Sequence, residues 1–211
     1  MAPELAELVV ADPPEAWAGA GFAVDDDGSC RVGNVRIRLV GRDAGKRIVG
    51  WAMRGLPPDF AGELDGLPTE ATHEPLCEPA EHPNGTTSID HVVVVTPDVE
   101  RTVAAAVDAG IEVRRTRKVA PEQYGFEGIQ TFFRLGEPIF ELLGPLEAGE
   151  GPPAWFGLAY TVADLDALVD RYGPSLGRVK DAVQPGRRIA TLRHKELGLS
   201  VPMAFMTPEP T

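Results

Sequence analysis

The chain has 211 residues, of which 43% are hydrophobic and 25% charged, a composition typical of a globular protein and unlike that of a disordered or collagen-like chain. Its 20 Lys and Arg against 32 Asp and Glu leave a net charge of −12, which disfavours binding to nucleic acids or to anionic membranes. The sequence contains no apolar run of the roughly 18 residues that a membrane span needs and no basic region at its start, so we expect a soluble, cytoplasmic protein.

The first 56 residues predict a short unit of one helix and several strands. Asp12-Pro13-Pro14 is typical of the start of a helix, because proline is well accommodated in a first helical turn. Apolar strands are predicted at residues 5–11, 32–41 and 46–56. The stretch 32–41 matches the stretch 135–144 position by position, which indicates a unit used more than once.

Residues 57–85 differ from the rest of the chain in composition. They are rich in Pro, Glu, Gly, Thr and His and show little apolar periodicity. We therefore predict a linker here, or a flap that covers a pocket. Of the histidines in this segment, His82 closely precedes the next strand.

A complete unit of strand, helix and three strands is predicted for residues 88–145. The β-branched run 89–95 is typical of a buried strand, and a helix begins at Thr96-Pro97-Asp98 and ends at Gly110. Strands follow near residues 111–115, 128–135 and 138–143.

Residues 153–208 repeat this pattern with a strand, a helix from Asp164 to Tyr172 and further strands. The sequence therefore predicts an α+β fold of tandem βαβββ units. We expect one domain over residues 86–211, with units 88–145 and 153–208, joined through the linker to the short unit of residues 1–56.

Tandem units with a histidine in the first strand and a glutamate in the last resemble the vicinal oxygen chelate superfamily, which includes glyoxalase I, extradiol dioxygenases, methylmalonyl-CoA epimerase and bleomycin-resistance proteins. The resemblance rests on residues 89–98, 130–136 and 139–145, and it covers residues 88–208 best. It implies that two units curl into one cup-shaped mixed sheet. It also implies a divalent metal inside the cup, held by ligands from both units.

His91 and Glu141 are the candidate catalytic residues. Strand alternation places His91 on one face with Val93 and Val95, and Glu141 on one face with Leu143. An ionisable group in such apolar company needs a partner. An imidazole and a carboxylate suit Zn, Mn, Fe or Ni as ligands, and the same two groups can exchange protons near neutral pH without a metal.

The other units lack side chains that would complete a metal site. The matching positions are Gly157 (or Leu158) and Ala204 in the second unit, and Leu5 and Arg38 in the N-terminal unit. Three interpretations stay open. In the first, His91 and Glu141 contact each other or a ligand in a metal-free pocket. In the second, His82, His194 or an acidic side chain of the flap completes a metal site. In the third, both residues are satisfied structural groups, and the protein only binds, as a drug-sequestering protein does, or scaffolds.

Further candidates for the wall of the pocket are Gln130, Phe132, Arg134 and Arg188. The first three share one face of a strand, and the planar guanidinium of Arg188 suits a carboxylate. We interpret the basic run 114–118 as a solvated strand end. The resemblance implies a small, largely apolar ligand with an oxygen function as the partner, and the sequence leaves open whether the protein forms a homodimer.

Overall fold

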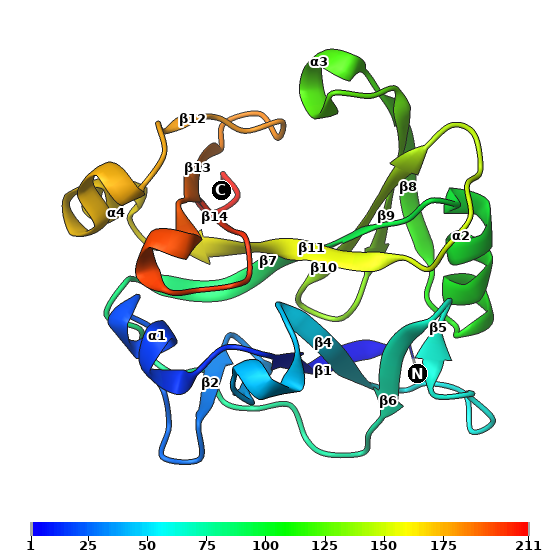
Figure 1. Cartoon of the computed structure of the whole chain (residues 1–211), viewed down its shortest axis with the longest axis horizontal. Coiled ribbons are helices and arrows are strands. Elements are labelled where there is room, and N and C mark those ends of the chain that lie inside the picture. The colour runs from blue at the N-terminus through cyan, green and yellow to red at the C-terminus, as the bar shows by residue number, and fades with distance from the viewer. Residues whose placement is uncertain (1, 211) are drawn as a thin grey trace.

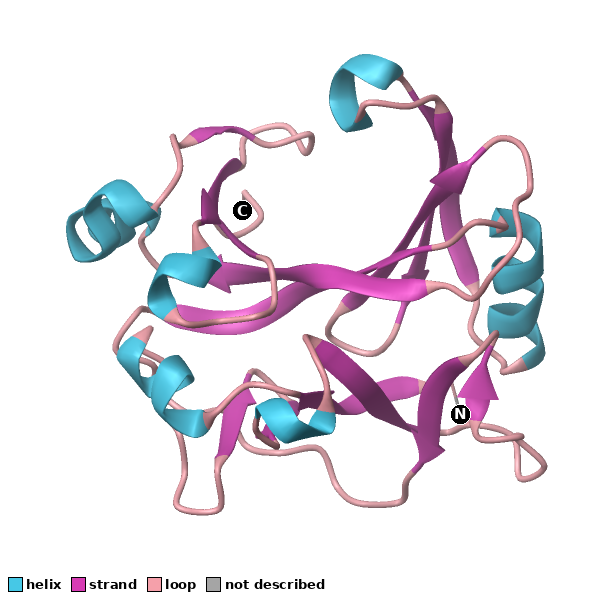
Figure 2. Ribbon diagram, viewed as in Figure 1, coloured by secondary structure: helices cyan, strands magenta, loops and turns pink. Residues whose placement is uncertain are grey.

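The structure is a computed structural model that describes residues 2–210, without the side chains of residues 123 and 124. Two mixed β-sheets are stacked against each other, and the helices lie at their margins (Figure 2). The predicted α+β class and the βαβββ pattern are confirmed.

The smaller sheet is formed by the N-terminal part of the chain and has the strand order β2-β3-β1-β4-β6-β5. Its strands are β1 (Glu4–Val10), β2 (Ser29–Val32), β3 (Val35–Leu39), β4 (Ile48–Arg54), β5 (Glu63–Leu64) and β6 (Leu67–Ala71). Helix α1 (Pro14–Gly19) and the 3-10 turn η1 (Arg42–Ala44) connect them.

The larger sheet has eight strands in the order β12-β13-β14-β11-β7-β10-β9-β8. Its first unit comprises β7 (Thr86–Val95), α2 (Val99–Asp108), β8 (Val113–Val119), α3 (Pro121–Tyr124), β9 (Gly128–Arg134) and β10 (Ile139–Pro145). The second comprises β11 (Ala154–Val162), α4 (Leu165–Tyr172), η2 (Gly173–Ser175), β12 (Lys180–Asp181), β13 (Arg188–Leu192), η3 (His194–Leu197) and β14 (Met203–Met206). The sheet is strongly curved, so that its edge strands β8 and β12 rise on opposite sides (Figure 1).

The two sheets share one topology. Strand β1 is parallel to β3 and antiparallel to β4, as β7 is parallel to β10 and antiparallel to β11. Strand β4 is in turn parallel to β6, as β11 is to β14. The smaller sheet therefore repeats the inner six strands of the larger one, and β4 begins a second, reduced unit rather than ending a single unit over residues 1–56.

The segment 57–85 differs from the linker or flap that we expected. It contains β5 and β6, joined through Asp65 and Gly66, whose φ angles of 51° and 88° form a tight hairpin. The Asp65 carboxylate accepts hydrogen bonds from Nε of Arg101 at 2.6 Å and Oγ1 of Thr102 at 2.5 Å. These bonds fix the hairpin to helix α2. Composition hid the two strands because Pro, Glu and Gly dominate the segment.

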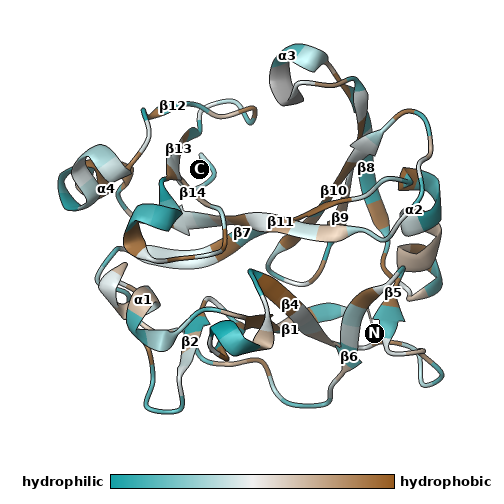
Figure 3. Ribbon diagram, in the orientation of Figure 1, coloured by the Kyte–Doolittle hydropathy of each residue, from teal (hydrophilic) through white to brown (hydrophobic). Residues whose placement is uncertain are grey.

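One hydrophobic core lies between the sheets. Strand β4, strongly hydrophobic in Figure 3, carries Trp51 into edge-to-face contact with Phe140 of β10 and Trp155 of β11, at centroid distances of 5.4 and 5.9 Å. At the other end, Phe22 packs on Tyr160 of β11 at 5.3 Å. Both sheets are thus tied to each other by aromatic side chains. Among the described residues, no helix combines the length and hydropathy needed to cross a membrane.

Because one face of the larger sheet is covered by the core, alternation turns the other side chains outward. On β7, Val92 and Val94 are fully buried in the core, whereas His91, Val93 and Val95 are partly exposed on the opposite side. We call this opposite side the outer face of the larger sheet. The face that we predicted for His91 is therefore confirmed.

Candidate functional site

The register of the larger sheet brings the candidate residues of three strands together on the outer face. His91 of β7 lies opposite Ile139 of β10, which lies opposite Arg134 of β9. One row further along, Glu141 of β10 lies opposite Phe132 of β9. Neighbouring strands are about 4.8 Å apart, so side chains in the same or adjacent rows reach one another.

A β-bulge in β7 adds a second acidic group to this face. Ala159 of β11 pairs with His91, but the next residue, Tyr160, pairs with Ile89, so that Asp90 is the extra residue. In a regular strand Asp90 and His91 would point to opposite faces. With the bulge, Ile89 takes the place in the core, and Oδ1 of Asp90 lies 2.9 Å from Nδ1 of His91.

Asp90 is held by three partners. In addition to His91, its Oδ2 accepts hydrogen bonds from the guanidinium of Arg187 and, at 3.2 Å, from the hydroxyl of Thr161. Arg187 is 3% exposed, and its Nε donates to the carbonyl of Thr207 at 2.8 Å. Burial alone would raise the pKa of Asp90, but the hydrogen bonds from His91 and Arg187 outweigh it and lower the pKa to about 2. Asp90 is therefore a carboxylate near neutral pH.

An ionised Asp90 accepts a hydrogen bond only, so Nδ1 of His91 carries a proton. The other ring nitrogen, Nε2, lies 3.4 Å from Oε2 of Glu141. Glu141 is held in turn by Gln130, whose amide donates to Oε1. Nε2 of His91 and Oε2 of Glu141 therefore face each other, and the two side chains keep small exposed fractions of 14% and 9%.

The network continues to the edge of the sheet. Nε of Arg117 on β8 donates to Oε1 of Gln130 at 2.5 Å, and the guanidinium lies over the ring of Phe132 at 5.8 Å. A continuous chain of polar groups therefore crosses the outer face from β8 to the loop before β13. Its members, in order, are Arg117, Gln130, Glu141, His91, Asp90 and Arg187.

Three members of this chain are absent from the sequence-based candidates. Asp90 was missed because alternation alone places it in the core, and Arg117 because a basic strand end is usually solvated. Arg188, which we predicted to line the pocket and to suit a carboxylate, has its guanidinium 2.9 Å from Asp166 of α4 in an exposed ion pair. The adjacent Arg187 is the arginine that joins the network.

The histidines suggested as a third metal ligand lie elsewhere. Nδ1 of His82 accepts a hydrogen bond from the backbone N–H of Ala23 at 3.0 Å, and Nε2 lies 3.2 Å from the carbonyl of Arg31, so that this side chain binds the smaller sheet. Its pKa is lowered, mainly by burial. His194 lies in η3, where burial lowers its pKa as well. Neither residue joins His91 and Glu141.

The second unit also fails to complete a metal site. The pairing of β11 with β14 and with β7 makes Gly157 the equivalent of His91, and Ala204 the equivalent of Glu141, as we predicted. A Cβ at Gly157 would come within 2.5 Å of the carbonyl of Pro202, so this position does not accept a ligating side chain. No group of three or more His, Cys, Asp or Glu side chains suited to a metal ion is present within residues 2–210. This donor set does not fit a tightly held divalent metal.

The equivalent face of the smaller sheet carries an ion pair. With Arg38 matched to Glu141, the pairing of β1 with β3 matches Glu7 to His91, which corrects the prediction of Leu5. Nε of Arg38 lies 2.9 Å from Oε1 of Glu7. This pair repeats the position, but not the chemistry, of His91 and Glu141.

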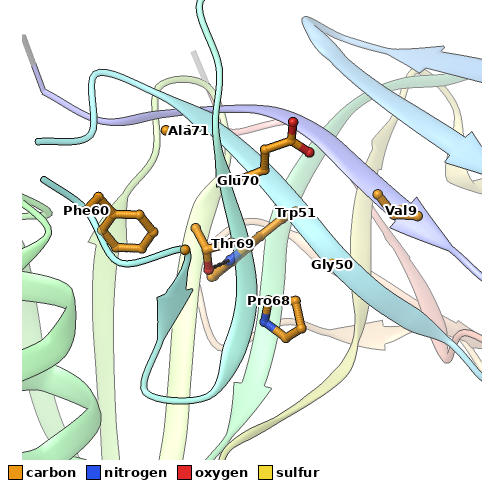
Figure 4. A pocket seen from close by; sticks show the side chains of 9 residues that line it. Val9, Gly50, Trp51, Phe60, Pro68, Thr69, Glu70 and Ala71 are labelled. Atoms are coloured by element: carbon orange, nitrogen blue, oxygen red, sulfur yellow. Dashed lines mark hydrogen bonds between the residues drawn. The ribbon is translucent and has the colours of Figure 1, made fainter. Parts of the chain in front are cut away.

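A pocket of about 400 Å³ lies on the smaller sheet (Figure 4). It is lined by Val9, Gly50, Trp51, Phe60, Gly62, Pro68, Thr69, Glu70 and Ala71. The lining contains a single titratable side chain, the exposed Glu70, so it lacks the paired groups that proton transfer needs. We therefore place the candidate chemistry on the outer face of the larger sheet.

Comparison with known proteins extends the structural result. The sequence matches no protein-family model and no curated protein. The structure is similar to that of a triple mutant of 4-hydroxymandelate synthase from Streptomyces coelicolor, with a TM-score of 0.65 and 15% identity over 99% of this chain and 93% of that chain. Methylmalonyl-CoA epimerase from Mycobacterium tuberculosis aligns with 60% of this chain and 91% of its own, with a TM-score of 0.47 and 20% identity.

The likeness to 4-hydroxymandelate synthase spans both sheets, so it includes the N-terminal repeat as well as the curved sheet that carries His91. At 15% identity the likeness concerns the fold. The chain thus has the fold of the vicinal oxygen chelate superfamily, as its tandem βαβββ pattern predicted.

Proposed function

We propose that the outer face of the larger sheet binds a small, largely apolar organic molecule with a carbonyl or hydroxyl oxygen, and that His91 and Glu141 exchange a proton with it. The observation that carries this proposal is the β-bulge at Asp90. The bulge places the carboxylate of Asp90 against Nδ1 of His91, on the face that also carries Glu141. Oε2 of Glu141 lies 3.4 Å from the other ring nitrogen, Nε2.

Each residue has a separate role. Asp90 fixes the ring orientation and the tautomer of His91, and it stabilises the imidazolium when the ring takes up a second proton. Nε2 then accepts a proton from the carbon next to a carbonyl of the ligand. The C–H electron pair forms the C=C bond of an enolate as the C=O π pair moves onto oxygen, an N–H bond forms on His91, and return of the proton to carbon completes a cycle with no net oxidation. Glu141 shares this proton, and Gln130 positions Glu141.

The surroundings suit an apolar ligand body. Val93 and Ile139 border His91 on the outer face, and the ring of Phe132 lies beside Glu141 in the adjacent strand. These side chains remove apolar surface from water when a ligand binds, at about 25 cal/mol per Å².

The test is exchange of ligand protons with solvent. The protein is incubated in D₂O with a panel of aryl ketones and 2-keto acids, and the loss of the protons next to the carbonyl is followed by NMR. Exchange with at least one compound is expected, and His91→Ala should abolish it and Glu141→Gln should reduce it by about 100-fold, as general acid–base groups do. His73→Ala is the matched control, because His73 is exposed outside the site.

Binding without exchange identifies a ligand-sequestering protein instead of a proton-transfer enzyme. Exchange that survives in His91→Ala at the rate of the unmodified protein refutes the assigned role of His91. If none of the compounds shifts the melting temperature or exchanges a proton, the proposal fails as a whole.

A further inference from the structure

The strands beside the His91–Glu141 pair carry three arginines on the outer face. Arg115 of β8 lies opposite Phe132, and Arg117 lies opposite Gln130. Arg134 of β9 lies in the same row as Ile139 and His91. We call Arg115, Arg117 and Arg134 the arginine wall.

None of the three has a carboxylate partner among the described residues, although the chain contains 32 Asp and Glu residues. Several other outward arginines are paired: Arg188 with Asp166, for example, and Arg38 with Glu7. The contrast extends to adjacent residues on β8. Arg114 is the extra residue of a bulge, and its guanidinium lies 3.6 Å from the Glu112 carboxylate.

Arg117 is held in a fixed orientation. Its Nε donates to Gln130 and its guanidinium stacks over Phe132, so the side chain loses less conformational freedom when it binds a ligand. Within the described part of the chain, its two terminal nitrogens have no hydrogen-bond partner. They are the donors of the planar fork that pairs with a carboxylate through two parallel hydrogen bonds.

We propose that the ligand of this face carries a carboxylate, which binds to the arginine wall with Arg117 as the principal contact. This inference rests on the proposed function and names the substrate class, an organic acid. Arg117 lies three interstrand spacings, about 15 Å, from the strand of His91, and its row, that of Gln130 and Leu143, is four residues along β10 from the row of His91. Its guanidinium approaches the His91–Glu141 pair through Gln130, which contacts both Arg117 and Glu141. A ligand of one ring or a short carbon chain therefore places its reactive carbon at His91 while its carboxylate meets Arg117.

The experiment compares three probes that share a phenyl ring by titration calorimetry: phenylacetate, its neutral amide phenylacetamide, and phenyl phosphate. Phenylacetate should bind about 10-fold more tightly than the amide, as expected for a charge-assisted pair, and rising salt should weaken it. Arg117→Gln should remove this preference. Arg114→Gln is the matched control, since it removes the same charge from the same strand, and it should keep the preference.

Equal affinity for phenylacetate and phenylacetamide overturns the carboxylate assignment and leaves the proton-transfer proposal intact. Tighter binding of phenyl phosphate than of phenylacetate also overturns it. A preference that Arg114→Gln and Arg117→Gln reduce equally shows a general charge effect and overturns the role of Arg117. Failure of all three probes to bind at millimolar concentration overturns this inference, and with no proton exchange in any compound it overturns the proposed function too.

Discussion

Replacement of Asp90 with asparagine keeps the shape of the side chain but removes the charge that links His91 to Arg187. The carboxylate has a pKa of about 2 in the folded protein against 3.8 for the free group. At about 1.4 kcal/mol per pH unit, this difference contributes about 2 kcal/mol to the free energy of unfolding at neutral pH. The variant also leaves the guanidinium of Arg187, which is 3% exposed, without its anion.

The sign of the effect fixes its pH dependence. Because the pKa of Asp90 is lowered on folding, its stabilisation is fully present above pH 3.8 and is lost as the pH falls through 2. At pH 3 about half of this contribution of Asp90 to the free energy of unfolding, about 1 kcal/mol, should remain. Asp90→Asn should therefore be less stable than the unmodified protein by about 2 kcal/mol or more at pH 7, and the two should converge in acid.

The assay is urea unfolding followed by tryptophan fluorescence at pH 7, 5, 4 and 3. Asp166→Asn is the control, because it breaks an ion pair to Arg188 that is exposed to water on both sides. This control should change stability far less than Asp90→Asn. A destabilisation by Asp90→Asn that stays constant between pH 7 and pH 3 would refute the electrostatic explanation, and the loss would then come from packing alone.

Three further predictions concern the fold. Gly157→Ala should destabilise the protein by about 1–3 kcal/mol in urea unfolding, because its Cβ meets a backbone carbonyl at 2.5 Å, whereas Gly19→Ala, with open space around it, should be close to neutral. Phe140→Ala should lower the free energy of unfolding by about 3–5 kcal/mol. Unfolding should remain a single transition, because Phe140 and Trp51 join the two sheets in one core. Separate transitions for the two sheets would contradict this prediction. Burial raises the pKa of the Cys30 thiol, so in a Cys77→Ala variant, which removes the partly buried second thiol, a thiol reagent at pH 8 should label Cys30 only after unfolding. Rapid labelling of Cys30 in the folded variant would show that β2 opens.

The repeated pattern of strands and helices was predictable from the sequence because apolar periodicity is strong where strands are long. The run 89–95 became β7, and the helices near residues 97–109 and 164–172 became α2 and α4. The face of His91 and the match of Gly157 and Ala204 to the site followed from alternation and from the repeat. These features depend on local pattern, which the sequence carries directly.

The missed features depend on register and on turns. The bulge that exposes Asp90 results from the pairing of β7 with β11, strands whose alignment no local pattern reveals. One signal was available but unused: Asp65-Gly66 is a typical hairpin turn, and it predicts the strands β5 and β6 that composition concealed. Whether Arg187 or Arg188 reaches the site depends on how the loop before β13 lies against the outer face of the larger sheet, and only the tertiary structure shows this.

The bulge at Asp90 has a consequence for how such a site arises. An ordinary ladder would show the imidazole outward and hide the carboxylate, or the reverse. A single additional residue in β7 turns both the imidazole and the carboxylate to the outer face, while the pairing of β7 with β10 continues undisturbed from His91 to Val95. The step from a lone histidine to a charge-supported one is therefore a matter of chain length at one position, which an insertion of a single codon supplies without any new element of structure.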